Sequence, residues 1–349
     1  MSVILNLLLF VLILGTIVFV HEAGHFIFAK IAGVYVYEFA LGMGPKIFSK
    51  KGKETEYSIR AIPIGGFCQM AGEDVDDDEL KKVPKDRTLQ AKSAWKRFLI
   101  MFFGAGNNFI LAIFVLFFIA LVWGGTTMNP VLSEVEKEYP ASEVGMQKGD
   151  VITKINGHKV TTSDDISLYL AVADTNKDSV IVVKRDNKEI TFKIKPKKVK
   201  EDGEEVYRYG IAMKQEREKG FVAAIKYTGK KTASIFKQMT VTVAWLFSGH
   251  IKLNQLSGPV GIYSVVGEQS RAGLANILYL LAFLSINVGF LNLLPLPAFD
   301  GGHILFIIIE KIKGSPVDPE LENKIHTVGL ILLMLLMVVV TINDIIKLF

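Results

Sequence analysis

The stretch Val3–Ala32, VILNLLLFVLILGTIVFVHEAGHFIFAKIA, decides the class of this protein. Its first charged side chain is Glu22. A membrane-spanning helix needs about 20 mainly apolar residues, and this run is long enough to supply them. It lacks the basic start and the short apolar core of a cleaved signal peptide. We therefore predict a membrane helix over residues 1–32, and its second half contains the pentad HEAGH at 21–25.

Three more apolar stretches have the length of a membrane helix: 98–123, 275–296 and 328–346. Half of the 349 residues are hydrophobic and 21% are charged, which excludes a disordered chain and disfavours a purely soluble one. No basic stripe carries interleaved aromatic residues, so nucleic acid is not an expected partner. The single cysteine, Cys68, excludes an intramolecular disulfide. The predicted fold class is a polytopic α-helical membrane protein with four transmembrane helices.

The positions of Lys and Arg predict how the chain crosses the bilayer. Thirteen of them lie between Lys30 and Arg97, whereas residues 124–133 carry none. Basic residues in short connections favour the cytosolic side. We predict that the first and third connections are cytosolic, and that both termini and the long second connection are extracytoplasmic.

The first connection, residues 33–97, is predicted to form a cytosolic β-hairpin or sheet associated with the membrane. Tyr57–Ile64 and Phe67–Met70 have the composition of short strands and flank Gly65-Gly66. The acidic run at 73–79 is predicted to be a solvated loop, because it has no histidine and no regular ligand spacing.

The second connection contains a predicted small α+β domain, residues 126–214. A helix is expected from Asp164 to Ala173, with Ser163 as its N-cap. The expected strands are 131–135, 150–155, 179–184, 189–194 and 206–212. Residues 215–274 are expected to be an amphipathic segment and a linker. Its part with helical spacing, 220–255, fits two arrangements, along the membrane surface or packed on the small domain.

The pentad at 21–25 has the spacing of a zinc site. His21 and His25 lie on one face of a helix, where two neutral imidazoles can bind one zinc ion. Glu22 can then reach a water molecule at the metal. A carboxylate in a membrane helix is costly and usually marks a functional interior. The alternatives are a non-catalytic metal site and a helix end whose polar side chains merely reach the interface.

A third ligand must come from elsewhere in the chain, because a catalytic zinc commonly has three protein ligands and one water. The third apolar segment, residues 275–300, ends in NLLPLPAFD, and Gly301, Gly302 and His303 follow. Its prolines break the helix, and irregular backbone at this depth is tolerated where it lines a watery cavity. The predicted orientation brings Asp300 to the same side as the histidine pair. Asp300 is therefore the expected third ligand, and His303 is the alternative. Residues 301–327 are expected to be a cytosolic loop and 328–349 the fourth transmembrane helix.

The chain resembles the site-2 protease family of intramembrane zinc metalloproteases, and within it the bacterial regulator-of-sigma-E type. The residues that carry the resemblance are the HExxH pentad, the segment NxxPxPxxDG at 292–301, GMGP at 42–45, GGF at 65–67 and SGPVG at 257–261. Sequence around Tyr139-Pro140-Ala141 and Ile155-Asn156-Gly157 is similar to a PDZ domain. The family usually has proline where this chain has Ala105, which puts the local bend of the second helix in doubt.

The resemblance implies an enzyme: a zinc metalloendopeptidase of a bacterial plasma membrane with its active site near the cytosolic side. Its Zn²⁺ ligands would be His21, His25 and Asp300, and Glu22 would be the general base. Its substrates would be transmembrane segments of single-pass membrane proteins, such as anti-sigma factors or remnant signal peptides, already trimmed by another protease. Asn292, and with less support Asn287, would contact the substrate. The PDZ-like domain would either bind peptide ends or exclude untrimmed proteins by size.

A substrate helix has its amides bonded internally and must be held extended before attack. An exposed edge strand can do this by β-addition. We expect this strand within Ile62–Met70, where Gly65 and Gly66 allow close backbone approach and Phe67 follows. The alternative is an ordinary hairpin.

Two rival functions remain. One is a catalytically silent zinc-containing scaffold that binds membrane helices or peptides through its PDZ-like domain; the presence of Glu22 argues against it, since zinc binding needs no base. The other is an ion transporter, which predicts discontinuous helices repeated in two halves. Four helices do not show that repetition.

Overall fold

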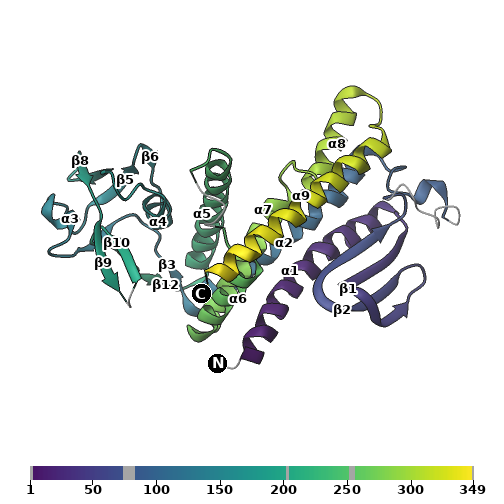
Figure 1. The fold of residues 1–349 in the computed structure, drawn as a ribbon, viewed down its shortest axis with the longest axis horizontal. Coiled ribbons are helices and arrows are strands. Elements are labelled where there is room, and N and C mark those ends of the chain that lie inside the picture. The colour runs from purple at the N-terminus through teal and green to yellow at the C-terminus, as the bar shows by residue number, and fades with distance from the viewer. Residues whose placement is uncertain (1–2, 74–82, 202–203, 251–255, 348–349) are drawn as a thin grey trace. The chain divides into compact units, whose positions relative to one another are not determined.

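The computed structural model describes residues 3–73, 83–201, 204–250 and 256–347, so most of the acidic run at 73–79 lies outside the described residues. The chain forms two compact units. One comprises Met1–Val115 with Leu253–Phe349 and is called here the helical unit. The other, Leu116–Lys252, is called the inserted unit. Figure 1 shows the elements of both.

Four helices of the described chain are long and apolar enough to cross a membrane, which fits a polytopic membrane protein. They are α1 (Val3–Ala32), α2 (Ala94–Trp123), α7 (Leu274–Asn292) and α9 (Pro319–Ile346). Their backbone polar groups bond within each helix, as a hydrocarbon environment requires. Helix α9 begins nine residues before the predicted 328, because Asp318 caps it and Pro319 occupies its first turn. Hydropathy alone detects the apolar part of such a helix and misses its polar first turns.

Two further helices lie where the sequence predicted irregular structure. The expected loop at 301–327 contains α8 (Asp300–Lys313) and the start of α9. Helix α8 forms because its apolar residues recur at helical spacing, and Gly314 in the left-handed region ends it. The expected linker contains α6 (Pro259–Arg271). Asp344 of α9 accepts hydrogen bonds from the N–H groups of Gly258 and Gly261, both 2.8 Å, and so satisfies the start of α6.

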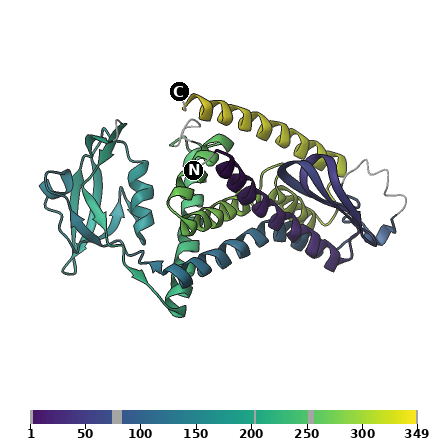
Figure 2. The same ribbon diagram turned by 90° about the horizontal axis from the view of Figure 1, so that it is seen from below.

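A bent β-hairpin packs against α1 (Figures 1 and 2). Its strands are β1 (Val36–Lys51) and β2 (Glu56–Met70), so the two strands expected on either side of Gly65-Gly66 form one element. Both strands fold back on themselves: Ala40 pairs with Phe67 on one side and with Ser58 on the other. Residues 66–70 therefore lie at an edge, with pairing to β1 on one side and to no other strand of the described chain.

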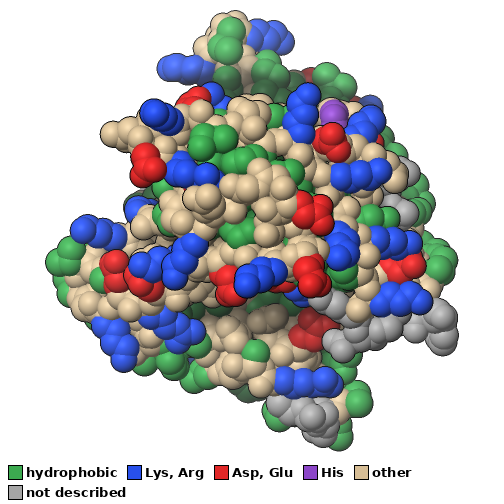
Figure 3. Space-filling model, turned by 90° about the vertical axis from the view of Figure 1, so that its left-hand side faces the viewer, with side chains coloured by type: hydrophobic (Ala, Val, Ile, Leu, Met, Phe, Trp, Pro, Cys, Tyr) green, Lys and Arg blue, Asp and Glu red, His purple; other side chains and the backbone are tan. Residues whose placement is uncertain are grey.

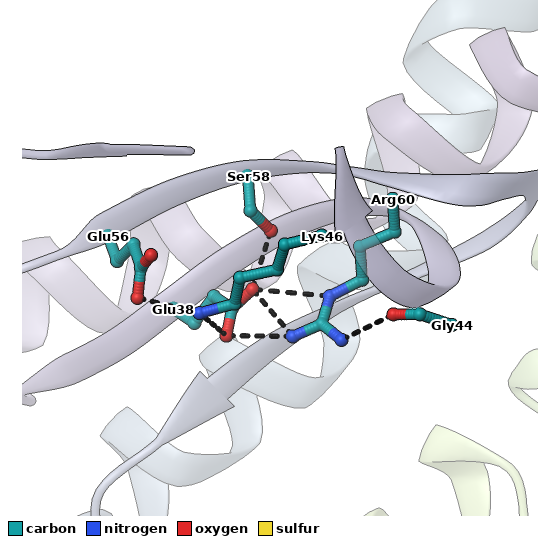
Figure 4. A network of polar contacts seen from close by, with 6 residues as sticks. All are labelled: Glu38, Gly44, Lys46, Glu56, Ser58 and Arg60. Atoms are coloured by element: carbon teal, nitrogen blue, oxygen red, sulfur yellow. Dashed lines mark hydrogen bonds and ion pairs between the residues drawn. The ribbon is translucent and has the colours of Figure 1, made fainter. Parts of the chain in front are cut away.

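A buried carboxylate braces the centre of this hairpin (Figure 4). Glu38 accepts hydrogen bonds from Ser58 (2.5 Å) and from the Arg60 guanidinium (2.8 Å). Burial would raise the pKa of Glu38, but Ser58, Arg60 and Lys46 hold it below its usual range. Arg60 also donates to the Gly44 carbonyl and lies over the Phe67 ring, 4.8 Å from its centroid. The ionised carboxylate thus ties several segments of the hairpin together.

The inserted unit has a four-stranded antiparallel sheet, in the order β6 (His158–Lys159), β5 (Val151–Ile155), β7 (Ser179–Arg185) and β8 (Lys188–Ile194). Its core is built from alternate apolar side chains of these strands with Leu132, Ile166 and Tyr169. Charged side chains of both signs are interspersed over the face that Figure 3 shows. The helical unit also contains the short helix η2 (Lys85–Arg87). The other short elements of the inserted unit are β3 (Gly125–Thr126), β4 (Leu132–Val135), α3 (Pro140–Glu143), α4 (Ser163–Ala171), β9 (Lys197–Glu201), β10 (Glu204–Arg208), β11 (Ile211–Met213) and β12 (Arg217–Glu218). The resemblance of this unit to a PDZ domain stays a prediction.

Three details of the inserted unit bear on the sequence-based expectations. Thr162, not Ser163, caps α4, and it forms a capping box with Asp165. The expected strand 206–212 is split, because Gly210 adopts a positive φ between β10 and β11. Helix α5 (Phe221–Phe247) packs on the small domain: its Lys231 and Ser234 both contact Asp164 of α4.

Candidate metal centre

Helix α1 places two imidazoles one turn apart, and the first residue of α8 meets them. The Nε2 atoms of His21 and His25 are 3.3 Å apart. The Asp300 Oδ2 atom lies 3.4 Å from each of them. The structure therefore brings together, from segments 275 residues apart, the three side chains that the sequence suggested as ligands.

The chemistry of these three groups fits a zinc ion. Their ligand atoms all lie within 4.8 Å of one another, and two imidazoles with one carboxylate form a common catalytic zinc set. Asp300 Oδ2 is buried without a hydrogen bond in the described chain. The Ile100 carbonyl lies 3.0 Å from His25 Nδ1 and can only accept, so the ring proton is on Nδ1 and the Nε2 lone pair faces the centre.

Helix α2 shapes the wall behind the histidines. Its Asn108 is fully buried and lies 3.5 Å from His21 Nδ1 through its side-chain amide, so it contacts a predicted ligand. A methyl group on Gly104 would collide with His25 Nε2, and one on Gly24 would collide with the Phe103 carbonyl. The two helices can approach this closely only because both positions are glycine. The small residues were visible in the sequence, but which of them face the imidazoles was not.

A strained turn positions Asp300. Ala298 has φ +71°, a left-handed conformation that costs a non-glycine residue about 1 kcal/mol or more. The Ala298 N–H donates to His326 Nδ1 of α9 at 3.2 Å, which holds the turn. Gly301 packs against the Leu293 and Leu294 carbonyls, leaving no room for a side chain. Sequence reasoning missed His326, because its separation from Asp300 gave no signal.

His303, the alternative third ligand, lies in a different cluster. Its Nδ1 is 3.1 Å from Glu322 Oε1, and its ring stacks on His326 with centroids 3.8 Å apart. The ligand atoms of this trio are close enough for a metal ion. However, His326 Nδ1 accepts from Ala298, so the proton of the neutral ring is on Nε2, and neither nitrogen has a lone pair to offer. This cluster supports the Asp300 turn and is a poor metal site.

A cavity of about 490 Å³ opens at the histidine pair and Asp300. Glu22 lines it, and its carboxylate accepts a hydrogen bond from the Cys68 backbone N–H. The edge strand supplies Phe67 to Met70 and the following turn supplies Glu73. Gly66 lies behind Glu22, where an added Cβ would come within 3.3 Å of Glu22 Cγ. The geometry thus joins a metal-ligand set, a carboxylate and an open strand edge in one cavity.

The remaining predicted substrate residues lie farther from this cavity. Asn292 is the last residue of α7 and Asn287 lies within it, and neither lines the cavity wall in the described chain. The Asn287 Oδ1 atom is buried without a hydrogen-bond partner there. Gly65, at φ +83°, forms the bend before the edge strand. Substrate contact by these residues stays a prediction.

The profile of peptidase family M50 matches residues 9–336 of this sequence. The chain belongs to peptidase family M50. Regulator of sigma-W protease RasP of Bacillus subtilis (strain 168) is 34% identical to this M50 peptidase, over 89% of this chain and 91% of RasP. A putative zinc metalloprotease of Clostridium perfringens is 38% identical over 89% of this chain and 90% of its own. Another, of Staphylococcus aureus (strain MSSA476), is 33% identical over 99% of both chains.

The family membership confirms several expectations from the sequence. The chain is a zinc metalloprotease of the site-2 type, and its cofactor is zinc. Its apolar helices and its relatives agree with a membrane protein. The roles of individual residues in this M50 peptidase stay predictions.

Proposed function

We propose that this M50 peptidase hydrolyses peptide bonds within the transmembrane segments of single-pass membrane proteins. Anti-sigma factors and remnant signal peptides trimmed by another protease are the proposed substrates. The observation that supports the proposal most is the convergence of His21, His25 and Asp300 in a cavity that also contains Glu22 and a strand edge. A membrane metalloprotease needs this combination, whereas a scaffold that only binds helices does not need Glu22.

His21, His25 and Asp300 would hold the zinc ion, which acts as a Lewis acid and lowers the pKa of a water molecule to about 7. Glu22 would accept a proton from the attacking water and return it to the leaving amine. The proton on His25 Nδ1, held by Ile100, keeps that ring in the orientation a ligand needs. The cavity admits water to the reacting atoms.

The edge strand would hold the substrate extended. Because alternate residues of a strand point their N–H groups to opposite sides, and Ala71 donates to Tyr35 of the neighbouring segment, the N–H groups of Cys68 and Met70 face the open edge. An unwound substrate segment can bond to these groups along its backbone. The nearby Glu22 then lies beside the bond to be cleaved.

The decisive test is Glu22→Gln in full-length protein reconstituted into phospholipid vesicles. We expect cleavage of a dye-labelled single-pass peptide to fall by at least a hundredfold, because general base catalysis contributes on the order of 10²–10⁴. Zinc content, measured by atomic emission, should stay near that of the parent protein. Undiminished cleavage would exclude Glu22 as the base, whereas absence of cleavage by the parent protein would favour the alternative, a silent zinc-containing scaffold.

We further propose that both termini and the inserted unit are extracytoplasmic and that the cavity opens near the cytosolic side. The basic residues between α1 and α2 support this orientation. Reporter fusions after residue 349 and within the 186–187 turn should be active only outside the cytosol. Labelling of the described inserted unit from the cytosolic side would show that the topology is the reverse of the one proposed. The proposed roles of the zinc ligands and Glu22 would not be affected.

A further inference from the structure

The backbone N–H groups along the open edge of residues 66–70 already face acceptors within this structure. Its two outward N–H groups are those of Cys68 and Met70. Cys68 donates to Glu22, the proposed base. Met70 donates to Glu73 Oε2 at 3.3 Å. Both donors that a substrate backbone would use are therefore bonded to carboxylates of the protein itself.

Glu73 contacts the end of this edge through both its backbone and its side chain. Its own N–H donates to the Met70 carbonyl at 3.3 Å, while its carboxylate accepts from the Met70 N–H. Its side chain lines the same cavity as His21, Glu22, His25 and Asp300. The proposed chemistry uses the carboxylates of Glu22 and Asp300 and gives no role to that of Glu73. A strand that extends along the edge to Met70 must displace it.

We propose, on the basis of the proposed function, that Glu73 competes with the substrate backbone for the edge strand. In the free enzyme the Glu73 carboxylate takes the place of a substrate carbonyl at the Met70 N–H. Substrate binding exchanges one acceptor for another, so the donor stays satisfied throughout. Glu73 thereby lowers the affinity for every segment that extends along the edge to Met70, so that only segments with enough other contacts bind well, and it acts as a specificity-determining residue.

An alternative use of Glu73 predicts the opposite result. A carboxylate in this cavity would attract a Lys or Arg side chain of the substrate, and removing it would then weaken substrate binding. Competition at the edge predicts tighter binding when the carboxylate is removed. The sign of the change in KM therefore separates the two uses.

The test compares Glu73→Ala and Glu73→Gln with the parent protein in phospholipid vesicles. The probe is a dye-labelled peptide with an apolar segment of about 20 residues between polar ends. For Glu73→Ala we expect KM to fall roughly two- to tenfold, the factor that one net hydrogen bond supplies, with kcat little changed. Glu73→Gln keeps a neutral acceptor and should lower KM less. Glu143→Ala, at an exposed carboxylate of the inserted unit, is the matched control and should leave KM unchanged.

Two readouts separate this role from a structural one. Without the probe, hydrogen exchange at the Met70 amide should be faster in Glu73→Ala than in the parent, and adding the probe should protect it in both. Zinc-stripped Glu73→Ala should bind the probe more tightly than the zinc-stripped parent does, by the same factor as the fall in KM. The same measurements on Glu73→Gln decide the question if the alanine variant does not fold.

A KM that is unchanged or raised in both variants overturns the proposal, and a rise in both assigns Glu73 to cation binding. These outcomes are distinct from failure of the proposed function. If Glu22→Gln cleaves normally, the mechanism is wrong whatever Glu73 does. If Glu22→Gln is inactive and the Glu73 variants bind the probe like the parent, the mechanism stands and Glu73 is not a competitor.

Discussion

The two units of this protein position their important side chains by different means. In the helical unit, polar groups meet where glycines allow close approach: Gly24 lies against the backbone of α2, Gly104 against the His25 ring, and Gly301 against the Leu293 and Leu294 carbonyls. In the inserted unit, a continuous set of buried apolar side chains, including Ile152 and Ile181, fixes the sheet. The hydrophobic effect drives the second arrangement in water. It offers little between helices in lipid, where close packing of small residues and specific polar contacts replace it. Adding volume should therefore damage the first unit most, and removing volume should damage the second.

The largest expected effect comes from adding one methyl group in the helical unit. In Gly104→Ala the new Cβ would overlap His25 Nε2, so the ring must leave its position or the helices must separate. We expect zinc affinity and cleavage to fall roughly a hundredfold, the upper range for groups that orient metal ligands. Competition with a fluorescent zinc chelator measures the affinity. Gly106→Ala is the control, because its Cβ would meet only phenylalanine rings, at 3.2 Å or more. Equal zinc binding in both variants would contradict the packing argument.

The converse change belongs in the inserted unit. Ile181 of β7 is fully buried, and Ile181→Ala should destabilise this unit by about 2–5 kcal/mol through lost burial and a cavity. Hydrogen exchange of β5, β7 and β8 in the full-length protein should accelerate accordingly. Zinc content should not change, because the ligands belong to the helical unit. Lys188→Ala, at an exposed position of β8, serves as the control. Loss of zinc in Ile181→Ala would show that the units are not independent.

A smaller effect tests how the metal ligand on α8 is held. His326→Leu removes the acceptor for the Ala298 N–H while keeping an apolar side chain in place. We expect about a tenfold loss of zinc affinity, because the turn before Asp300 is strained and loses its support. Adding Ala298→Gly should recover part of this loss, since glycine adopts a positive φ without strain. Lys324→Ala on the exposed side of α9 is the control, and a loss of equal size there would point to α9 as a whole.

The smallest effect is the acid sensitivity of the inserted unit. Burial would raise the pKa of Asp150, but the Arg185 guanidinium, 2.6 Å away, and the Gln147 N–H hold it below its usual range. A lowered folded-state pKa stabilises the fold above the unfolded-state value near 3.9, and this contribution is lost as pH falls through the folded-state value. Exchange of the inserted unit should accelerate below about pH 4. In Arg185→Gln exchange should already be faster at neutral pH and should accelerate less as pH falls, because the pKa of Asp150 no longer lies well below its unfolded-state value. Identical profiles in the variant and the parent would contradict a role for this ion pair.

Much of the fold follows from local signals. The apolar runs predict the four helices of the described chain that are long and apolar enough to cross a membrane, because such a segment must satisfy its own backbone and expose apolar side chains. Alternating β-branched residues and turn pairs such as Asn156-Gly157 place four strands of the inserted unit, β4, β5, β7 and β8, within a residue or two. They do not predict β3, β6, β9 or β12, and the expected strand 206–212 is split into β10 and β11. Helices α6 and α8 escape this reasoning: they are short and partly polar, and their ends are defined by contacts such as that of Asp344.

The candidate site divides in the same way. The i, i+4 spacing of His21 and His25 is a local property of a helix, and the prolines before Asp300 mark an irregular segment. Partners that hold these groups, Ile100 and His326, come from other helices and carry no sequence signal of their own.

The sequence by itself determined the membrane class, the zinc-binding spacing and the family of this protein, because each depends on residues close together in the chain. Only the tertiary structure decided that Asp300 rather than His303 meets the histidine pair, because a strained turn and α9 set its position. It also decided that Glu73 occupies the edge strand at Met70, since the open side of a strand is defined by what the fold leaves unpaired.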